Sequence, residues 1–187
     1  MPRKASFKRE DFTNTAFAIA KELGLSAVTA REIANRLECS TRPMFTYFDS
    51  VDELRGTVTE KAIALFREKL SINGDLTALG SSMISFSIAD PGLWNIIVSS
   101  ETLAGLIPEL TPAVAQFNRL NAGQADHALK MLLCAIPSLS RLPEDEAYRM
   151  TKQLAFAELK ALRETPGYLN GDFNLQERRS RFESWID

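Results

Sequence analysis

The sequence is poor in the residues that much of protein chemistry uses. Its 187 residues include only two cysteines, Cys39 and Cys134, and one histidine, His127. Two cysteines far apart cannot build a disulfide scaffold, and they suit a reducing compartment, so we expect a cytoplasmic protein. A lone histidine beside Asp126 falls short of the three or four ligands of a zinc site. We therefore expect neither a metal nor another cofactor.

Longer patterns are missing as well. No run of about 18 apolar residues is present, so we expect no membrane span. The first residues, MPRKASFKRED, lack the apolar core of a secretory signal. The motifs G-x-S-x-G and H-E-x-x-H and a glycine-rich phosphate loop are also missing, so we expect the protein not to be an enzyme.

The net charge of −2 is unevenly distributed along the chain. Residues 1–47 carry eight Lys/Arg and five Asp/Glu, a net charge of +3. The other 140 residues carry 14 basic and 19 acidic side chains, a net charge of −5. A basic N-terminal segment on an acidic body is compatible with a nucleic-acid-binding head.

The hydrophobic periodicity predicts an all-α protein. Apolar residues recur at helical spacing over 8–24, and no segment alternates apolar and polar residues as a strand does. Gly24 is placed to end this first helix. The pattern also predicts helices near 51–73, 75–90, 93–100, 101–107, 112–121, 124–141, 144–164 and 175–186.

The stretch from Thr29 to Phe48 predicts a helix-turn-helix. Thr29 and Glu32 have the spacing of a capping box at the start of one short helix. Ser40 is placed to cap a second, with Pro43 in its first turn, where the missing N–H breaks no helical bond. In a helix-turn-helix the second helix enters the major groove of DNA.

The exposed side of that second helix supplies the candidate DNA contacts. Thr41, Arg42, Thr46 and Tyr47 are expected to point away from the protein core. Arg42 can read a guanine edge or grip a phosphate. The hydroxyls of Ser40 and Thr29 can donate to phosphates. The alternatives are a solvated surface charge for Arg42 and a helix cap alone for Thr29.

These residues give the chain a resemblance to the tetracycline-repressor (TetR) family of bacterial regulators. The segments AFAIAKELGLSAVTAREIANRLECS and MFTYFDSVDEL carry it over about residues 8–65. The positions that agree in type and spacing are Gly24, Thr29, Ile33, Ala34, Ser40, Phe48 and Leu54. A looser similarity covers SFSIADPGLWNIIV.

The resemblance implies a homodimer with two domains per chain. Residues 1–50 would form a three-helix DNA-binding domain, and residues 51–187 a helical domain for effector binding and dimerisation. A small-molecule effector would release the dimer from a double-stranded DNA operator. Two recognition helices about 34–36 Å apart would require a near-palindromic operator.

The chain departs from the family pattern in the expected phosphate contacts. Phe45 stands where the family often has Tyr, and Val51 where it often has Lys, so two phosphate contacts are lost. Tyr47 replaces a frequent His and is a possible substitute for it. Arg42-Pro43 replaces a more usual pair of small residues. The departures concern operator contacts and affinity, and leave the expected fold unchanged.

Residues for ligand binding and dimerisation are harder to select. Polar or aromatic residues among apolar neighbours could line an effector cavity: Trp94, Ser85, Asn95 and His127. The alternative is a core position for Trp94 and surface or capping roles for the others. A seam with spacing 3, 4, 3, 4 suits helix packing, either across a dimer or within the core. It contains Ala147, Met150, Leu154, Ala157 and Ala161.

Three functions remain as hypotheses. The first is a ligand-responsive transcriptional regulator, more specifically a repressor. The second is a helical dimeric interaction protein with weakened or lost DNA binding. The third is a small helical enzyme, for which the sequence offers no motif.

Overall fold

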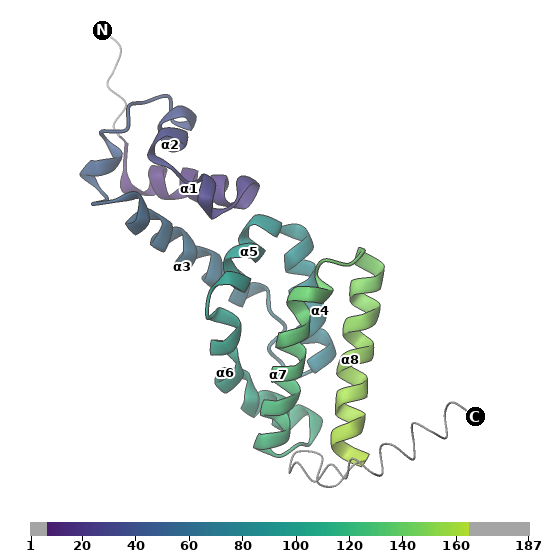
Figure 1. Ribbon diagram of the computed structural model, residues 1–187. Coiled ribbons are helices and arrows are strands. Elements are labelled where there is room, and N and C mark those ends of the chain that lie inside the picture. The colour runs from purple at the N-terminus through teal and green to yellow at the C-terminus, as the bar shows by residue number, and fades with distance from the viewer. Residues whose placement is uncertain (1–6, 165–187) are drawn as a thin grey trace, which may run out of the picture. The chain divides into compact units, whose positions relative to one another are not determined.

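Figure 1 shows the computed structural model, which describes residues 7–164. This part of the chain contains eight α-helices, two short 3₁₀ helices and no strand, so the expected all-α class is confirmed. The elements are α1 (Arg9–Leu23), η1 (Leu25–Ala27), α2 (Ala30–Arg36), η2 (Met44–Thr46), α3 (Val51–Lys69), α4 (Leu76–Ala89), α5 (Pro91–Ser99), α6 (Thr102–Asn118), α7 (Ala122–Leu139) and α8 (Glu144–Glu164). The predicted helix over 175–186 lies outside the described residues. Over residues 7–164, no helix combines the length and apolarity needed to span a membrane.

The chain divides into two compact units, and neither is one continuous stretch. Unit 1 comprises residues 1–70 and 82–106, and unit 2 comprises residues 71–81 and 107–187. Helices α4 and α6 therefore each contribute residues to both units. The predicted domain boundary at residue 50 falls inside unit 1.

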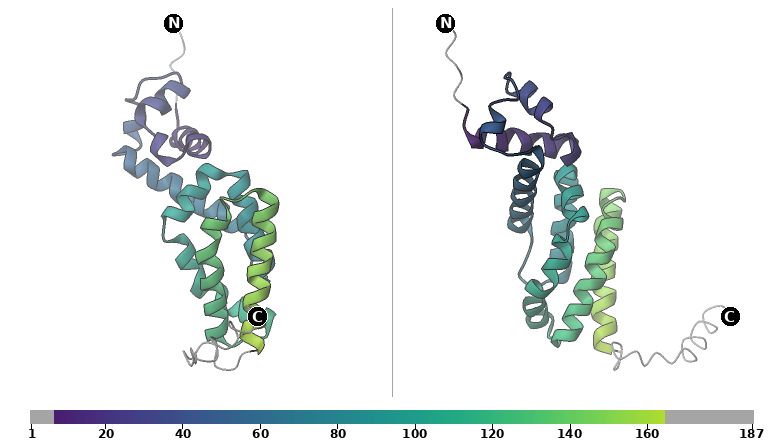
Figure 2. Two further views of the ribbon diagram at one scale, coloured as in Figure 1. Left: turned by 45° about the vertical axis from the view of Figure 1, so that its right-hand side comes forward. Right: turned by 60° about the vertical axis from the view of Figure 1, so that its left-hand side comes forward.

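Unit 1 is built around α1. In both views of Figure 2, α1 lies between α2 on one side and α5 on the other. The apolar stripe of α1 is buried, as its periodicity predicts, with Phe12, Ala16 and Ile19 fully inaccessible. Leu23, which continues the stripe, is 59% exposed because α1 ends there. Lys21 of α1 also pairs with Asp90, next to the start of α5, at 2.6 Å.

Several helix boundaries follow from local hydrogen bonds. The hydroxyl of Thr29 accepts a bond from the Glu32 amide at 3.2 Å, so the predicted cap of α2 is confirmed. The predicted capping box is only half formed, because the Glu32 carboxylate pairs with Arg36 and not with the Thr29 amide. Ser50 caps α3 in the same way, through the Glu53 amide at 3.0 Å. Gly24 follows α1 with a φ of 85°, a backbone conformation that glycine adopts at no steric cost.

The prediction of separate helices over 101–107 and 112–121 is wrong, because α6 is one helix that contains Pro108 and Pro112. A proline inside a helix removes a backbone hydrogen bond and usually bends or breaks the helix. Here the two prolines are four residues apart, so they lie on one face, and both are exposed. The carbonyl groups that lose their partners on this face are accessible to water, which lowers the cost of continuing the helix.

In unit 2, α7 and α8 run side by side (Figures 1 and 2). The Gln124 side chain donates to the carbonyl of Leu162 at 3.1 Å, so the start of α7 lies beside the end of α8. This antiparallel arrangement follows from the short connection between the helices. The buried face of α8 consists of Ala147, Thr151, Ala155, Glu158 and Leu162.

Candidate nucleic-acid interface

The segment after α2 does not form the second helix of a helix-turn-helix. Residues 44–46 make only the single 3₁₀ turn η2, and Ser40 caps no α-helix, so both predictions are wrong. Pro43 explains the difference: the residue before a proline is pushed away from helical backbone angles, and here that residue is Arg42. Glu38, with a φ of 51°, turns the chain sharply out of α2.

The segment is nevertheless anchored on the core of unit 1. Met44 and Phe48 are each only 1% exposed, so they hold the segment in the core of unit 1. The guanidinium of Arg9 lies 4.5 Å from the centre of the Phe48 ring. The hydroxyl of Tyr47 donates to the carbonyl of Phe7 at 2.7 Å. These contacts fix the C-terminal end of a loop in which Ser40, Thr41 and Arg42 are exposed.

All six predicted DNA-contacting residues are exposed: Thr29, Ser40, Thr41, Arg42, Thr46 and Tyr47. Their roles now differ. Thr29 uses an oxygen lone pair for its cap, and its hydroxyl hydrogen stays available to a phosphate. Tyr47 has already donated its hydroxyl hydrogen to Phe7, so it cannot donate to a phosphate without breaking that bond. Exposure is thus confirmed for the set, whereas DNA contact stays a prediction.

Two arginines of this region have no carboxylate partner among residues 7–164. They are Arg42 in the loop and Arg31 in the first turn of α2, and both side chains are exposed. Five other cations of unit 1 are paired or hydrogen-bonded: Arg9 to Glu53, Lys21 to Asp90, Arg36 to Glu22 and Glu32, Arg55 to Asp52, and Lys61 to Asn14. Lys8 and Lys69 are exposed and, like Arg31 and Arg42, have no ion pair within residues 7–164. On α2 and the loop after it, the uncompensated positive charge is that of Arg31 and Arg42.

Arg36, on the same helix as Arg31, is an arginine held in ion pairs. Its guanidinium lies 2.8 Å from the Glu22 carboxylate and 3.1 Å from that of Glu32. The hydrogen bond from Arg36 lowers the pKa of the Glu22 carboxyl, and the same bonds raise the pKa of Arg36. Arg36 is therefore held in place by two carboxylates, which distinguishes it from Arg31 and Arg42.

Two residues were missed or misjudged at the level of sequence. Arg31 was not selected, although its place two residues after the Thr29 cap puts it in the first turn of α2. Phe45, an aromatic residue that would usually be buried, is 50% exposed. Neither has a local sequence signal: Arg31 is distinguished only by lacking an ion pair, and Phe45 only by the 3₁₀ turn that directs it outward.

The four predicted effector-binding residues are divided between the two units. In unit 1, Trp94 is 6% exposed, and its ring centre lies 5.9 Å from that of Phe66. Trp94 therefore occupies a core position, the alternative to a place in a cavity lining. Ser85 and Asn95 in the same unit are exposed. In unit 2, His127 is half-buried, and its Nε2 lies 3.2 Å from Oε1 of the buried Glu158. The residues that would line an effector cavity thus stay a prediction.

The predicted dimer seam on α8 is offset from the buried face of that helix. Ala147 is 1% exposed and is covered by its own chain, so it is not accessible to a partner. Met150 is 38% exposed, Ala157 is exposed, and Leu154 and Ala161 are half-buried. These four residues form an accessible apolar stripe beside the face that packs in unit 2.

Comparison with known proteins does not place the chain in a family. A scan against the models of protein families finds no match. A search of curated proteins finds no significantly similar sequence. The features of this chain that favour a nucleic-acid interface are therefore α2, the loop after it, and the uncompensated charge of Arg31 and Arg42.

Proposed function

We propose that this protein is a DNA-binding transcriptional regulator of the kind that its resemblance to the TetR family implies. It would bind a near-palindromic operator as a homodimer and be released by a small-molecule effector, as a repressor is. The observation that carries the proposal is the pair of exposed arginines without carboxylate partners, Arg31 and Arg42. Phosphates supply most of the affinity in such complexes, and only uncommitted cations can neutralise them without first breaking an ion pair.

The two arginines have different expected roles. Arg42 lies in the loop that protrudes between the buried Met44 and the turn at Glu38, so its guanidinium can reach a base edge in the major groove. A bidentate contact to guanine contributes about 1–3 kcal/mol of discrimination against a wrong base. Arg31 follows the Thr29 cap by two residues in the first turn of α2, a placement that suits a contact to phosphate. Such a contact positions the protein on DNA and carries no sequence information.

Dimerisation would use the accessible apolar stripe of α8. Met150, Leu154, Ala157 and Ala161 repeat at 4, 3, 4 and remain at least partly exposed in the single chain. On α7, Met131 is also 41% exposed. Two such helices from each of two copies can pack as a four-helix bundle, since small and medium apolar residues at this spacing allow close approach.

The decisive experiment is selection of bound sequences from random DNA, followed by titration of the best sequence. Arg42→Ala should weaken specific binding by about 5- to 150-fold and relax preference at one base pair. Arg31→Ala should weaken binding to all sequences alike and reduce the salt slope by about 1. Arg149→Ala is the control for the loss of one positive charge, because Arg149 is an exposed arginine of α8, far along the chain from the head, and pairs with Glu146.

Two results would contradict the proposal. One is the absence of salt-sensitive binding to any selected sequence. The other is an equal loss of affinity in Arg42→Ala and Arg149→Ala, which would mean that net charge alone drives the interaction.

A second function is favoured by the missing recognition helix. A loop with one 3₁₀ turn fills the major groove less completely than an α-helix does. The hydroxyl of Tyr47 already donates its hydrogen to the carbonyl of Phe7, so it is not available to a phosphate. The alternative is a helical dimeric interaction protein with weakened or lost DNA binding. Sedimentation that shows a dimer, together with no binding to selected DNA at low salt, would favour this alternative.

A further inference from the structure

The loop after α2 exposes a phenylalanine between two buried anchors. Phe45, in the turn η2, is 50% exposed, although phenylalanine is among the side chains most often buried. Met44 before it and Phe48 after it are each 1% exposed. The chain therefore holds the Phe45 ring at the surface on a segment that is fixed to the core of unit 1 on both sides.

The Phe45 ring has no ring partner in the described part of the chain. Among residues 7–164 it neither packs against another aromatic ring nor lies under a cation. Tyr47, the other exposed aromatic residue of this loop, differs. Its ring centre lies 5.9 Å from that of Phe12, and its hydroxyl donates to the Phe7 carbonyl. Phe45 is thus the aromatic side chain of the loop that stays available to another molecule.

The backbone that carries Phe45 is fixed by hydrogen bonds of the turn. The Thr46 amide donates to the Pro43 carbonyl at 3.2 Å, and the Tyr47 amide donates to the Met44 carbonyl at 3.0 Å. The ring of Pro43 restricts the backbone further, and its φ is −58°. A side chain on a backbone that is already ordered loses little conformational freedom on binding, so its contacts contribute more to affinity.

The charges on α2 and the loop identify the kind of partner that fits this ring. Arg42, three residues before Phe45, and Arg31 are exposed and have no carboxylate partner among residues 7–164. Two uncompensated cations favour a polyanion such as DNA. In the major groove of DNA the apolar group is the C5 methyl of thymine, and phenylalanine is one of the side chains that contact it.

We propose, on the basis of the proposed DNA-binding function, that Phe45 contacts the C5 methyl of a thymine in each half-site of the operator. The phenyl ring has no hydrogen-bond donor or acceptor, so it selects thymine by apolar contact alone. Residues 42 and 45 are at most about 11 Å apart, and base pairs lie about 3.4 Å apart along the DNA axis. The thymine should therefore lie within a few base pairs of the guanine that Arg42 is expected to read.

Replacing thymidine by deoxyuridine in the selected operator tests this contact. Deoxyuridine pairs with adenine as thymidine does and lacks only the C5 methyl, so the hydrogen-bonding groups in the groove stay the same. The thymidines of a half-site are replaced one at a time. At one position the replacement should weaken wild-type binding by about 3- to 5-fold per half-site, as expected for one buried methyl group. In Phe45→Ala the same replacement should change the affinity by less than about twofold, as expected when the two groups no longer interact.

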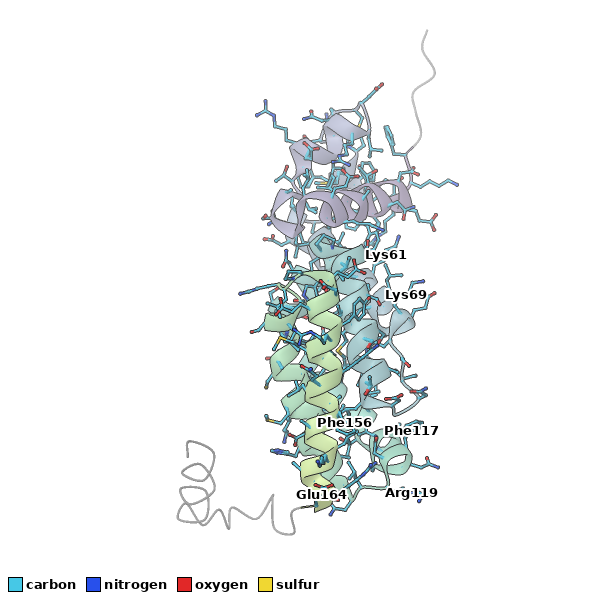
Figure 3. The ribbon with its side chains drawn as sticks, turned by 90° about the vertical axis from the view of Figure 1, so that its right-hand side faces the viewer. Lys61, Lys69, Phe117, Arg119, Phe156 and Glu164 are labelled. Carbon is cyan, nitrogen blue, oxygen red and sulfur yellow. The ribbon has the colours of Figure 1, made fainter. Side chains whose placement is uncertain are left out.

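Two further variants are controls for the loss of a side chain. Phe156→Ala removes a phenylalanine that is 69% exposed on α8 (Figure 3) and should keep the wild-type response to deoxyuridine. Phe45→Leu keeps an apolar side chain at the same place and should retain part of the response. Far-UV circular dichroism and a thermal midpoint equal to wild type show that Phe45→Ala is folded, as expected for an exposed side chain.

The outcomes separate the thymine contact from DNA binding itself. If the wild type binds no selected sequence, both are wrong. If it binds DNA but no deoxyuridine replacement weakens binding, the thymine contact is wrong and the proposed function stands. If Phe45→Ala binds more weakly but keeps the wild-type response to deoxyuridine, the ring acts in another way, such as a wedge between base steps, and the thymine contact is again wrong. Loss of the response in Phe156→Ala would also overturn the assignment to Phe45.

Discussion

The sharpest structural prediction concerns the glycine at the start of α5. A Cβ on Gly92 would overlap the backbone carbonyl oxygens of Ala20 and Lys21, and it would lie 2.9 Å from the carbonyl carbon of Lys21. Ordinary contacts of this kind are about 3.5–4.0 Å. Because the obstacle is the backbone at the end of α1, neither side can yield by rotating a side chain.

The magnitude follows from two opposing effects. Overpacking of a well-filled contact typically costs about 1–3 kcal/mol, and more where the backbone must move. The gain from replacing glycine by alanine in a helix is at most about 1 kcal/mol, and smaller at a helix start. Gly92→Ala should therefore lower the free energy of unfolding by about 1–3 kcal/mol.

Gly56 provides the matched comparison. It lies inside α3, and a Cβ there meets nothing within 4 Å. Gly56→Ala should raise the free energy of unfolding by about 0.5–1 kcal/mol, because only helix propensity changes. Urea unfolding followed by circular dichroism, at one fixed protein concentration, measures both variants. If Gly92→Ala is as stable as Gly56→Ala, the close approach of α1 and α5 is wrong.

Three further predictions concern caps, charge and association. The hydrogen bond from Arg36 lowers the pKa of Glu22, so this pair stabilises the fold at pH values above the usual pKa of a glutamate. The stabilisation is lost as the pH falls through the lowered pKa. In Arg36→Gln, NMR titration should show the pKa of Glu22 returning upward. Thr29→Ala should cost about 0.5–2 kcal/mol of unfolding free energy by removing the α2 cap, whereas Thr29→Ser should cost far less. Met150→Asp should shift sedimentation toward the monomer, and Phe156→Asp should not; the reverse result would move the dimer surface to another face of α8.

Sequence periodicity predicts most of this fold for a physical reason. The buried stripe of α1 and the caps at Thr29 and Ser50 depend on contacts within one or two helical turns, which sequence spacing reports directly. Asn121 and Gln124, which form a capping box at the start of α7, follow the same logic. Such features do not require knowledge of which helices meet.

The errors arise where two local rules compete or where distant partners decide. At Ser40 the capping signal competes with the restriction that Pro43 places on Arg42, and the restriction prevails. In α6 the two prolines would end a helix, but their shared exposed face allows it to continue. Arg31 and Arg42 can be identified as cations without ion pairs only when the carboxylate partners of the neighbouring cations are known. The linear sequence does not contain this information.

The division of the chain into two interleaved units has a consequence for its synthesis. Unit 1 needs α5, which ends at Ser99, yet residues 71–81 of unit 2 are made before α5. While the ribosome is still adding α4, the apolar side of Phe66 lacks Phe86 and Trp94, whose rings lie 5.1 and 5.9 Å away in the finished protein. A chain that stalls there leaves the Phe66 ring uncovered, and exposed apolar surface of this kind favours aggregation during synthesis.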